Sequence, residues 1–349
     1  MSARKLFGTD GIRGKANVYP MTGDIAFILG RAVTAFFLGK KTRNKQPLII
    51  LGKDTRRSCY MLEQAFSAGV CAQGGQVILT GPLPTPGVAF VTESMRADAG
   101  VMISASHNRF DDNGIKIFDA AGFKLPDLVE AELERMVFHP DLMNTKVGAE
   151  LGNAKRLKEV FGRYLVRVKS AFSSKFDLEG LRIVVDPANG AAYKVAPMMF
   201  QELGAEVVSL GVTPNGMNIN EDCGALYPEK ARDAVTKYRA DLGICLDGDG
   251  DRLVAIDEKG KIIHGDKLIA LFSKFFLDTG KIKKGDVVVG TVMSNLGLEK
   301  YVESLGLKFL RTKVGDRYIF EEMRKHNSLL GGEPSGHIIF HQYSTTVDG

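Results

Sequence analysis

Short apolar runs alternate along most of the chain with segments whose apolar residues recur at helical spacing. In the first part of the chain, the pattern predicts strands at 48–51, 76–80 and 99–103 and helices at about 22–40 and 57–72. Such alternation of strands and helices is typical of a layered α/β sheet.

The same alternation continues to the end of the sequence, with further strands predicted at 181–185, 206–210, 241–246, 287–289 and 309–311. A chain of 349 residues is too long for one ordinary domain. We therefore expect an α/β protein of three consecutive α/β/α layered domains with mixed sheets and an active site in the cleft between them. The expected domains are 1–153, 154–257 and 258–349.

Two segments of the first expected domain carry turn residues. The stretch 81–87 contains three prolines and two glycines, which predicts irregular structure. Residues 111–114 read Asp-Asp-Asn-Gly, which predicts a hairpin-type turn leading into a strand at 115–118.

Each expected domain also contains an apolar strand that ends in a polar loop. These loops are Ser104–Asn108 (S-A-S-H-N), Asp247–Arg252 (D-G-D-G-D-R) and Gly332–His337 (G-E-P-S-G-H). Ligands of open α/β sheets bind at the carboxyl ends of strands, so loops of adjacent sheets can converge on one cleft.

In the first loop, the hydroxyl of Ser106 is followed directly by the imidazole of His107. This pair could be a nucleophile and its proton-transfer partner. A polar loop whose side chains bond to the backbone explains the motif equally well. Lys116 alternates with apolar residues in the next strand, so its ammonium could point either toward the loop or toward solvent.

The second loop places Asp247, Asp249 and Asp251 at alternate positions. Carboxylates this close repel one another by up to about 4 kcal/mol per pair at 4 Å and an effective dielectric near 20. A hard divalent cation removes this repulsion, and oxygen ligands favour magnesium or calcium. The glycine phase and the preceding strand differ from an EF-hand, and a solvated acidic turn is the alternative.

Two further loops offer groups that could bind a phosphate and sugar hydroxyls, respectively. Thr9 and Arg13 lie in a glycine-rich stretch, where Arg13 could offer a forked donor to a phosphate. Glu333, Ser335 and His337 supply an acceptor, a hydroxyl and an imidazole, which suit sugar hydroxyls. An ordinary glycine-rich turn and a polar turn are the respective alternatives.

Composition narrows the class of protein. The net charge of +5 fits a small anionic substrate, and the lack of a dense Lys/Arg run argues against nucleic acid as a partner. The four cysteines are scattered, as in reduced proteins, and no apolar run suits a signal peptide or a membrane span. We expect a soluble cytoplasmic protein.

The candidate side chains also favour one type of reaction. A serine beside an oxygen-ligated cation favours phosphoryl transfer, and no G-x-S-x-G motif supports a hydrolase.

With these motifs assembled, the chain resembles the α-D-phosphohexomutase superfamily and, within it, the bacterial phosphoglucosamine mutases. The resemblance rests on F-G-T-D-G-I-R-G at 7–14 and on the three polar loops, in the family's order. The opening segment and T-K-V-G-D-R at 312–317 favour the glucosamine branch over phosphomannomutase or phosphoglucomutase, which stay the alternatives. The family has proline where Arg109 stands here, and glutamine or methionine in place of Pro334.

The resemblance implies an isomerase that interconverts glucosamine 6-phosphate and glucosamine 1-phosphate through glucosamine 1,6-bisphosphate, a step toward UDP-N-acetylglucosamine. It implies a phosphorylated Ser106 and one Mg²⁺ held by that phosphate and the three aspartates. The implied catalytic and substrate-binding residues are Ser106, His107, Lys116, Arg13, Thr9, Arg252, Glu333, Ser335 and His337. The family's fourth domain, with its R-x-S-G-T-E-P loop, has no counterpart in this sequence, and the resemblance implies that the third domain, 258–349, is incomplete. A truncated, non-catalytic phosphosugar- or metal-binding remnant is therefore a second hypothesis, and a homodimer is left open.

Overall fold

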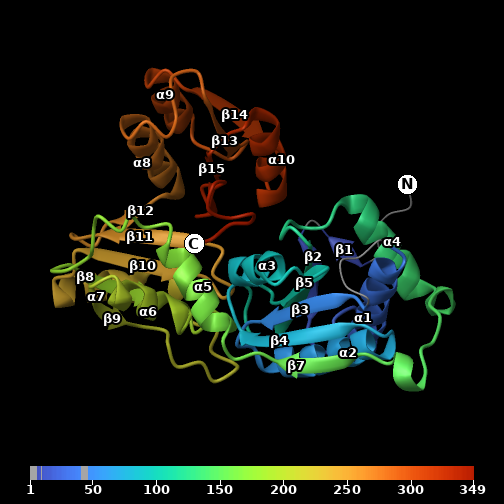
Figure 1. The fold of residues 1–349 in the computed structure, drawn as a ribbon. Coiled ribbons are helices and arrows are strands. Elements are labelled where there is room, and N and C mark those ends of the chain that lie inside the picture. Colours follow the sequence, from blue (N-terminus) through green and yellow to red (C-terminus); the bar gives the residue numbers. More distant parts are fainter. Residues whose placement is uncertain (1–5, 9, 41–45) are drawn as a thin grey trace.

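A computed structural model describes residues 6–8, 10–40 and 46–349 of the chain. It contains three separate sheets that follow one another in sequence, each with its own helices (Figure 1). We call these parts the first, second and third units. Their mixed sheets confirm the expected fold class of consecutive α/β domains.

The first unit is built on a seven-stranded sheet of order β1-β2-β6-β5-β3-β4-β7. Its strands are β1 (Phe7–Gly8), β2 (Gly11–Lys15), β3 (Leu48–Lys53), β4 (Gln76–Pro82), β5 (Ala99–Ile103), β6 (Asp112–Asp119) and β7 (Asn153–Arg156). Its helices are α1 (Gly23–Leu38), α2 (Arg57–Ala72), α3 (Thr85–Ser94) and α4 (Asp127–Phe138), with 3₁₀ turns η1 (Pro140–Leu142) and η2 (Gly148–Glu150).

The second unit has a five-stranded sheet of order β12-β11-β10-β8-β9, and the third has a four-stranded sheet of order β14-β13-β15-β16. The second comprises α5 (Val160–Lys169), β8 (Arg182–Asp186), α6 (Val195–Glu202), β9 (Glu206–Ser209), η3 (Gly224–Leu226), α7 (Glu229–Tyr238), β10 (Leu242–Leu246), β11 (Leu253–Asp257) and β12 (Ile262–Ile263). The third comprises α8 (Gly265–Asp278), β13 (Val287–Thr291), α9 (Leu296–Ser304), β14 (Lys308–Thr312), α10 (Asp316–His326), β15 (Leu330–Gly332) and β16 (Ile338–Phe340). The predicted domain boundaries stay predictions. The strands next to them, β7 and β12, pair with the sheets of the preceding units.

Two local predictions are wrong. The stretch 81–87 is not wholly irregular, because β4 extends to Pro82 and α3 begins at Thr85. Pro86 lies in the first turn of α3, where the missing N–H of proline costs no helical hydrogen bond. Residues 112–114 belong to β6 rather than to a turn, because they pair with β2, a partner almost 100 residues away that local turn propensity does not report.

The three polar loops occupy equivalent places in the three sheets. The strands that precede them, β5, β10 and β15, each pair in parallel with one neighbour: β3, β8 and β13. Each then turns through its loop into an antiparallel strand: β6, β11 or β16. The loops are therefore strand-to-strand connections at the carboxyl end of a parallel pair.

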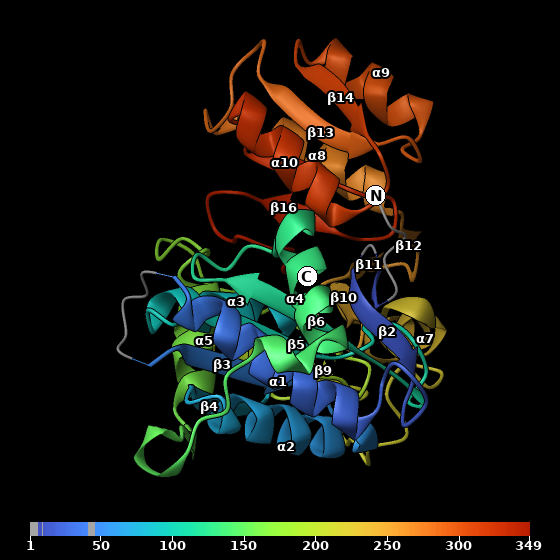
Figure 2. The same cartoon turned by 90° about the vertical axis from the view of Figure 1, so that its right-hand side faces the viewer.

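The first and second units share one apolar core. Buried side chains of α3 and β5, such as Val88 and Met102, belong to the same cluster as Tyr164 of α5, Val185 of β8 and Leu246 of β10. In Figure 1, α3 and α5 lie between the two sheets. The third unit lies on one side of the other two, as both views show (Figure 1, Figure 2).

Close packing of α1 on α2 provides a test of the fold. A Cβ on Gly69 would lie 2.0 Å from the carbonyl oxygen of Phe27, and backbone atoms cannot turn away. We expect Gly69→Ala to lower the free energy of unfolding by about 1–3 kcal/mol. Gly162→Ala in α5 is the control: apart from its chain neighbours and the backbone of its own helix, no described atom lies within 4 Å of the new Cβ. This variant should raise the free energy of unfolding by up to about 1 kcal/mol. Urea denaturation measures both, and equal stability of the Gly69 variant and the parent would contradict the packing.

Candidate active site

A cleft of about 500 Å³ lies where the three units meet. This volume suits a small-molecule ligand. Seven of the predicted site residues line it: Arg13, Ser106, His107, Asp251, Arg252, Glu333 and His337. All three polar loops therefore reach one cleft, as the sequence suggested.

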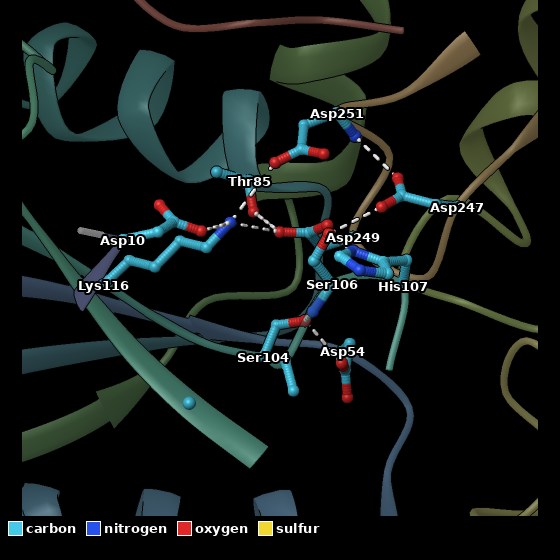
Figure 3. A network of polar contacts seen from close by, with 12 residues as sticks. Asp10, Asp54, Thr85, Ser104, Ser106, His107, Lys116, Asp247, Asp249 and Asp251 are labelled. Atoms are coloured by element: carbon cyan, nitrogen blue, oxygen red, sulfur yellow. Dashed lines mark hydrogen bonds and ion pairs between the residues drawn. The ribbon is translucent and has the colours of Figure 1, made fainter. Parts of the chain in front are cut away.

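Ser106 lies at the floor of this cleft in an unusual backbone conformation. Its φ of +52° is in the left-handed region, and its side chain is almost fully buried. Its amide N–H donates to Ser104 Oγ (2.9 Å), which in turn donates to Asp54 Oδ2 (2.6 Å; Figure 3). Ser106 Oγ donates to Asp247 Oδ2 (2.6 Å), so the hydroxyl of the first loop touches the carboxylate of the second.

The three aspartates of the second loop are buried and close together. Asp247, Asp249 and Asp251 each offer a carboxylate oxygen within 4.8 Å of the others. Asp249 Oδ1 is buried and has no hydrogen-bond partner among the described residues. This unsatisfied oxygen, beside two more carboxylates and the Ser106 hydroxyl, fits the ligand set of a hard divalent cation.

Lys116 of β6 approaches the aspartates from the first unit. Its side chain is 2% exposed, and its Nζ lies 2.9 Å from Asp249 Oδ2, 3.2 Å from Asp251 Oδ2 and 3.3 Å from Asp10 Oδ2. Burial alone would lower the pKa of Lys116, but these three carboxylates raise it well above its ordinary value. The ammonium therefore points toward the loop, which decides between the two orientations that the sequence left open.

Two side chains beside Ser106 have shifted pKa values. Burial and the neighbouring carboxylates Asp251 and Asp249 raise the pKa of Asp247 to about 7. Burial, with the positive charges of Arg252 and Arg13, lowers the pKa of His107 to about 4. His107 is therefore neutral at pH 7. Its Nδ1 lies 3.5 Å from Ser106 Oγ, at the limit of hydrogen bonding.

The third loop joins the second through a histidine. His337 Nε2 lies 3.2 Å from Asp251 Oδ1, and its Nδ1 lies 3.2 Å from Glu333 Oε2. Burial would lower the pKa of His337, but contacts with Asp251 and Glu333 raise it to about 10, so the imidazole is charged. Arg252 Nε lies 3.3 Å from the same Nε2.

The remaining predicted residues are placed less directly. Ser335 is exposed, and its hydroxyl donates to Glu333 Oε2 (3.0 Å) instead of lining the cleft. Asp247, Asp249 and Lys116 lie beneath the cleft surface rather than on it. Thr9 lies outside the described residues.

Four charged residues that line the cleft were not assigned from the sequence: Asp10, Lys124, Asp316 and Arg317. Lys124 Nζ bridges Asp10 Oδ1 (2.5 Å) of the first unit and Asp316 of the third (2.9 Å to each oxygen). Lys124 thus joins the first and third units at the cleft wall. Asp10 and Asp316 lie inside motifs that were noted, whereas no motif marks Lys124 as part of the site.

Known families and known proteins match almost the whole chain. Models of the phosphoglucomutase/phosphomannomutase family match here as α/β/α domain I at residues 4–143, domain II at 162–260 and domain III at 264–349. A phosphoglucosamine mutase of Nitratidesulfovibrio vulgaris is 52% identical over 347 residues, which are 99% of this chain and 76% of that protein.

Solved structures agree in fold. A phosphoglucomutase/phosphomannomutase family protein from Burkholderia thailandensis is 26% identical with a TM-score of 0.83, covering 98% of this chain and 73% of that one. An N-acetylphosphoglucosamine mutase of Aspergillus fumigatus, solved with GlcNAc-6P and magnesium, is 17% identical with a TM-score of 0.56, covering 96% of this chain and 67% of that one. These comparisons confirm the resemblance found from the motifs.

The aspartate loop predicts a measurable metal affinity. Asp249→Asn keeps the size of the side chain but removes one negative charge, so Mg²⁺ should bind at least about tenfold more weakly, since even outer-shell substitutions cost 10–100-fold. Isothermal titration calorimetry measures the affinity. Asp257→Asn is the control, because the carboxylate of Asp257 accepts from the amides of Lys259 and Lys261 in an exposed turn and bonds to no described residue of the cleft. Unchanged affinity in the Asp249 variant would show that the loop is not the metal site.

Proposed function

The chain belongs to the phosphoglucomutase/phosphomannomutase family of isomerases, and on this premise we propose that it interconverts glucosamine 6-phosphate and glucosamine 1-phosphate with Ser106 as the phosphoryl carrier. The glucosamine branch was expected from the sequence and agrees with curated relatives 52–53% identical to this chain. The observation that carries the proposal is the 2.6 Å contact between Ser106 Oγ and Asp247. It places a nucleophilic oxygen beside a carboxylate cluster suited to a cation.

The proposed chemistry is phosphoryl transfer in both directions. A sugar hydroxyl oxygen forms a bond to phosphorus while the bond from phosphorus to Ser106 Oγ breaks, and the hydroxyl proton passes to a base. The sugar then carries two phosphates, as glucosamine 1,6-bisphosphate. Return of the other phosphate to Ser106 completes the isomerisation. Positioning and charge stabilisation supply most of the rate in such reactions.

Cationic side chains that line the same cleft as Ser106 would stabilise the transferring group. Arg13 and Arg252 line the cleft, and the Nε of Arg13 is buried without a hydrogen-bond partner among the described residues. Neutral His107 can accept a proton, and charged Lys116 can donate one. When bound to Asp247, Asp249, Asp251 and the seryl phosphate, Mg²⁺ would act as a Lewis acid on the phosphoryl oxygens.

The third loop is the proposed site for the sugar ring. Glu333 is held by the amide of Gly315 (2.7 Å to Oε1) and by His337, so its carboxylate is fixed at the cleft wall, where it can accept hydrogen bonds from ring hydroxyls. Ser335 would contribute through Glu333. Thr9 is kept as a proposed substrate contact because of its motif alone.

We also propose a cytoplasmic location for the protein. None of the helices in the described part of the chain is long and apolar enough to cross a membrane. All four cysteines are free, which fits a reducing compartment. A homodimer stays a prediction.

The carrier role of Ser106 is tested by mass spectrometry of the purified protein and of its Ser106→Ala variant. We expect phosphate on Ser106 in the parent and none in the variant. Mutase kcat in the variant should fall by roughly 10³-fold or more, since loss of a covalent nucleophile costs up to about 10⁶ elsewhere. Ser170→Ala, an exposed serine after α5, is the control. Phosphate found only on another residue would refute the mechanism.

Substrate choice is tested by kcat/KM for the 6-phosphates of glucosamine, glucose and mannose. We expect glucosamine 6-phosphate to be preferred, on the grounds of the relatives and of the T-K-V-G-D-R segment, whose Asp316 and Arg317 line the cleft. A clear preference for mannose or glucose phosphate would favour the alternative branches instead.

A further inference from the structure

We propose that Asn220, a residue of the second unit, is a positioning residue that holds the Ser106 loop in register with the aspartate loop. The proposal rests on the proposed function, because it concerns the same phosphoryl carrier. Asn220 lies outside every motif that identifies the family here. It is 3% exposed and lies in the loop between β9 and η3.

The side-chain amide of Asn220 crosses from the second unit to the first. Its Nδ2 donates to the carbonyl oxygens of both Ser106 and Asn108, each at 2.9 Å. Both contacts fall on the main chain on either side of His107. The side chain of Asn220 therefore recognises the path of the loop rather than any side chain in it.

The same two carbonyls are also held from within the first unit. Nη2 of Arg56 donates to Ser106 O and to Asn108 O, again at 2.9 Å each. Arg56 is fully buried and is fixed by Asp54 Oδ2 at 2.8 Å from its Nε. Nη2 of Arg56 and Nδ2 of Asn220 each carry two N–H bonds, and the carbonyl oxygens of Ser106 and Asn108 each have two lone pairs. The four hydrogen bonds therefore use all four of these N–H bonds and all four lone pairs.

The two donors have different consequences because they come from different units. Arg56 fixes the loop to its own sheet, whereas Asn220 ties it to the unit that carries the metal ligands. The aspartate loop lies directly against this contact: a Cβ on Gly248 would be 2.5 Å from Ser106 O and 2.8 Å from Asn220 Nδ2. Asn220 therefore sets the distance between the Ser106 hydroxyl and the carboxylate of Asp247.

Removing the amide should leave the loop attached to Arg56 but free to shift against the metal ligands. We expect Asn220→Ala to lower mutase kcat by about 10- to 100-fold, since a displacement near 1 Å costs this much in transfer reactions. KM should stay within about threefold, because no sugar-binding residue is touched. The ³¹P NMR signal of the Ser106 phosphate should shift.

Asn218→Ala is the matched control. Asn218 lies two residues away in the same loop, and its side chain hydrogen-bonds to Thr213 O and to the amide of Asn215 but to no other described residue. The control should match the parent in kcat, KM and the ³¹P signal. Asn220→Asp is the second variant: it keeps the size of the side chain but cannot donate when ionised, and it should reproduce the effect if the alanine variant does not fold.

Three results would overturn the inference: a kcat within about twofold of the parent, an unshifted ³¹P signal, or an equal loss in the Asn218 control. Failure of the proposed function looks different, because the parent itself would then lack mutase activity. In that case, the variants can still be compared by the ³¹P signal and by the rate at which glucosamine 1,6-bisphosphate phosphorylates Ser106.

Discussion

The site depends on how three buried aspartates in one short loop are compensated. Their mutual repulsion would make the loop unstable without nearby positive charge, and removal of one partner from a buried ion pair typically costs about 3–5 kcal/mol. Lys116 of the first unit pairs with Asp249 and Asp251, and His337 of the third unit adds a second positive charge beside Asp251. The acidic loop of the second unit therefore needs both neighbouring units, which explains why the cleft forms where all three meet.

The three loops reach a common cleft because each sheet contains the same kind of connection between two strands. A strand of a parallel pair ends, the chain passes through a polar loop, and an antiparallel strand returns. The return strand is what brings Lys116 to the site, since β6 places it opposite Met102 of β5, next to the loop that Ser106 occupies. The repeat is architectural, and the three loop sequences differ because each contributes a different chemistry.

Much of the fold and of the candidate site could be predicted from the sequence, because the patterns that indicate them lie in short segments of the chain. Apolar strands followed abruptly by S-A-S-H-N, D-G-D-G-D-R and G-E-P-S-G-H give both the sheet ends and the chemistry. What could not be predicted depends on partners far apart in the chain. The strand pairing of Asp112–Gly114 with β2 overrides a turn-forming sequence. Lys124 and Asn220 stand in segments with no motif, and only the packing of the units shows what they contact. Arg56 could have been noticed, since a charged run directly after the buried strand β3 marks a sheet end.

The division of labour around Ser106 follows from the chemistry. Phosphoryl transfer asks little covalent work of the protein beyond the carrier itself, so accuracy of placement matters most. The hydroxyl must stay free to exchange a phosphoryl group, so it cannot be the point of attachment. The structure instead holds the backbone of Ser106 at both ends, through its amide by Ser104 and through its carbonyl by Arg56 and Asn220. A left-handed backbone at this residue is unfavourable alone, and these main-chain contacts from two units are what maintain it.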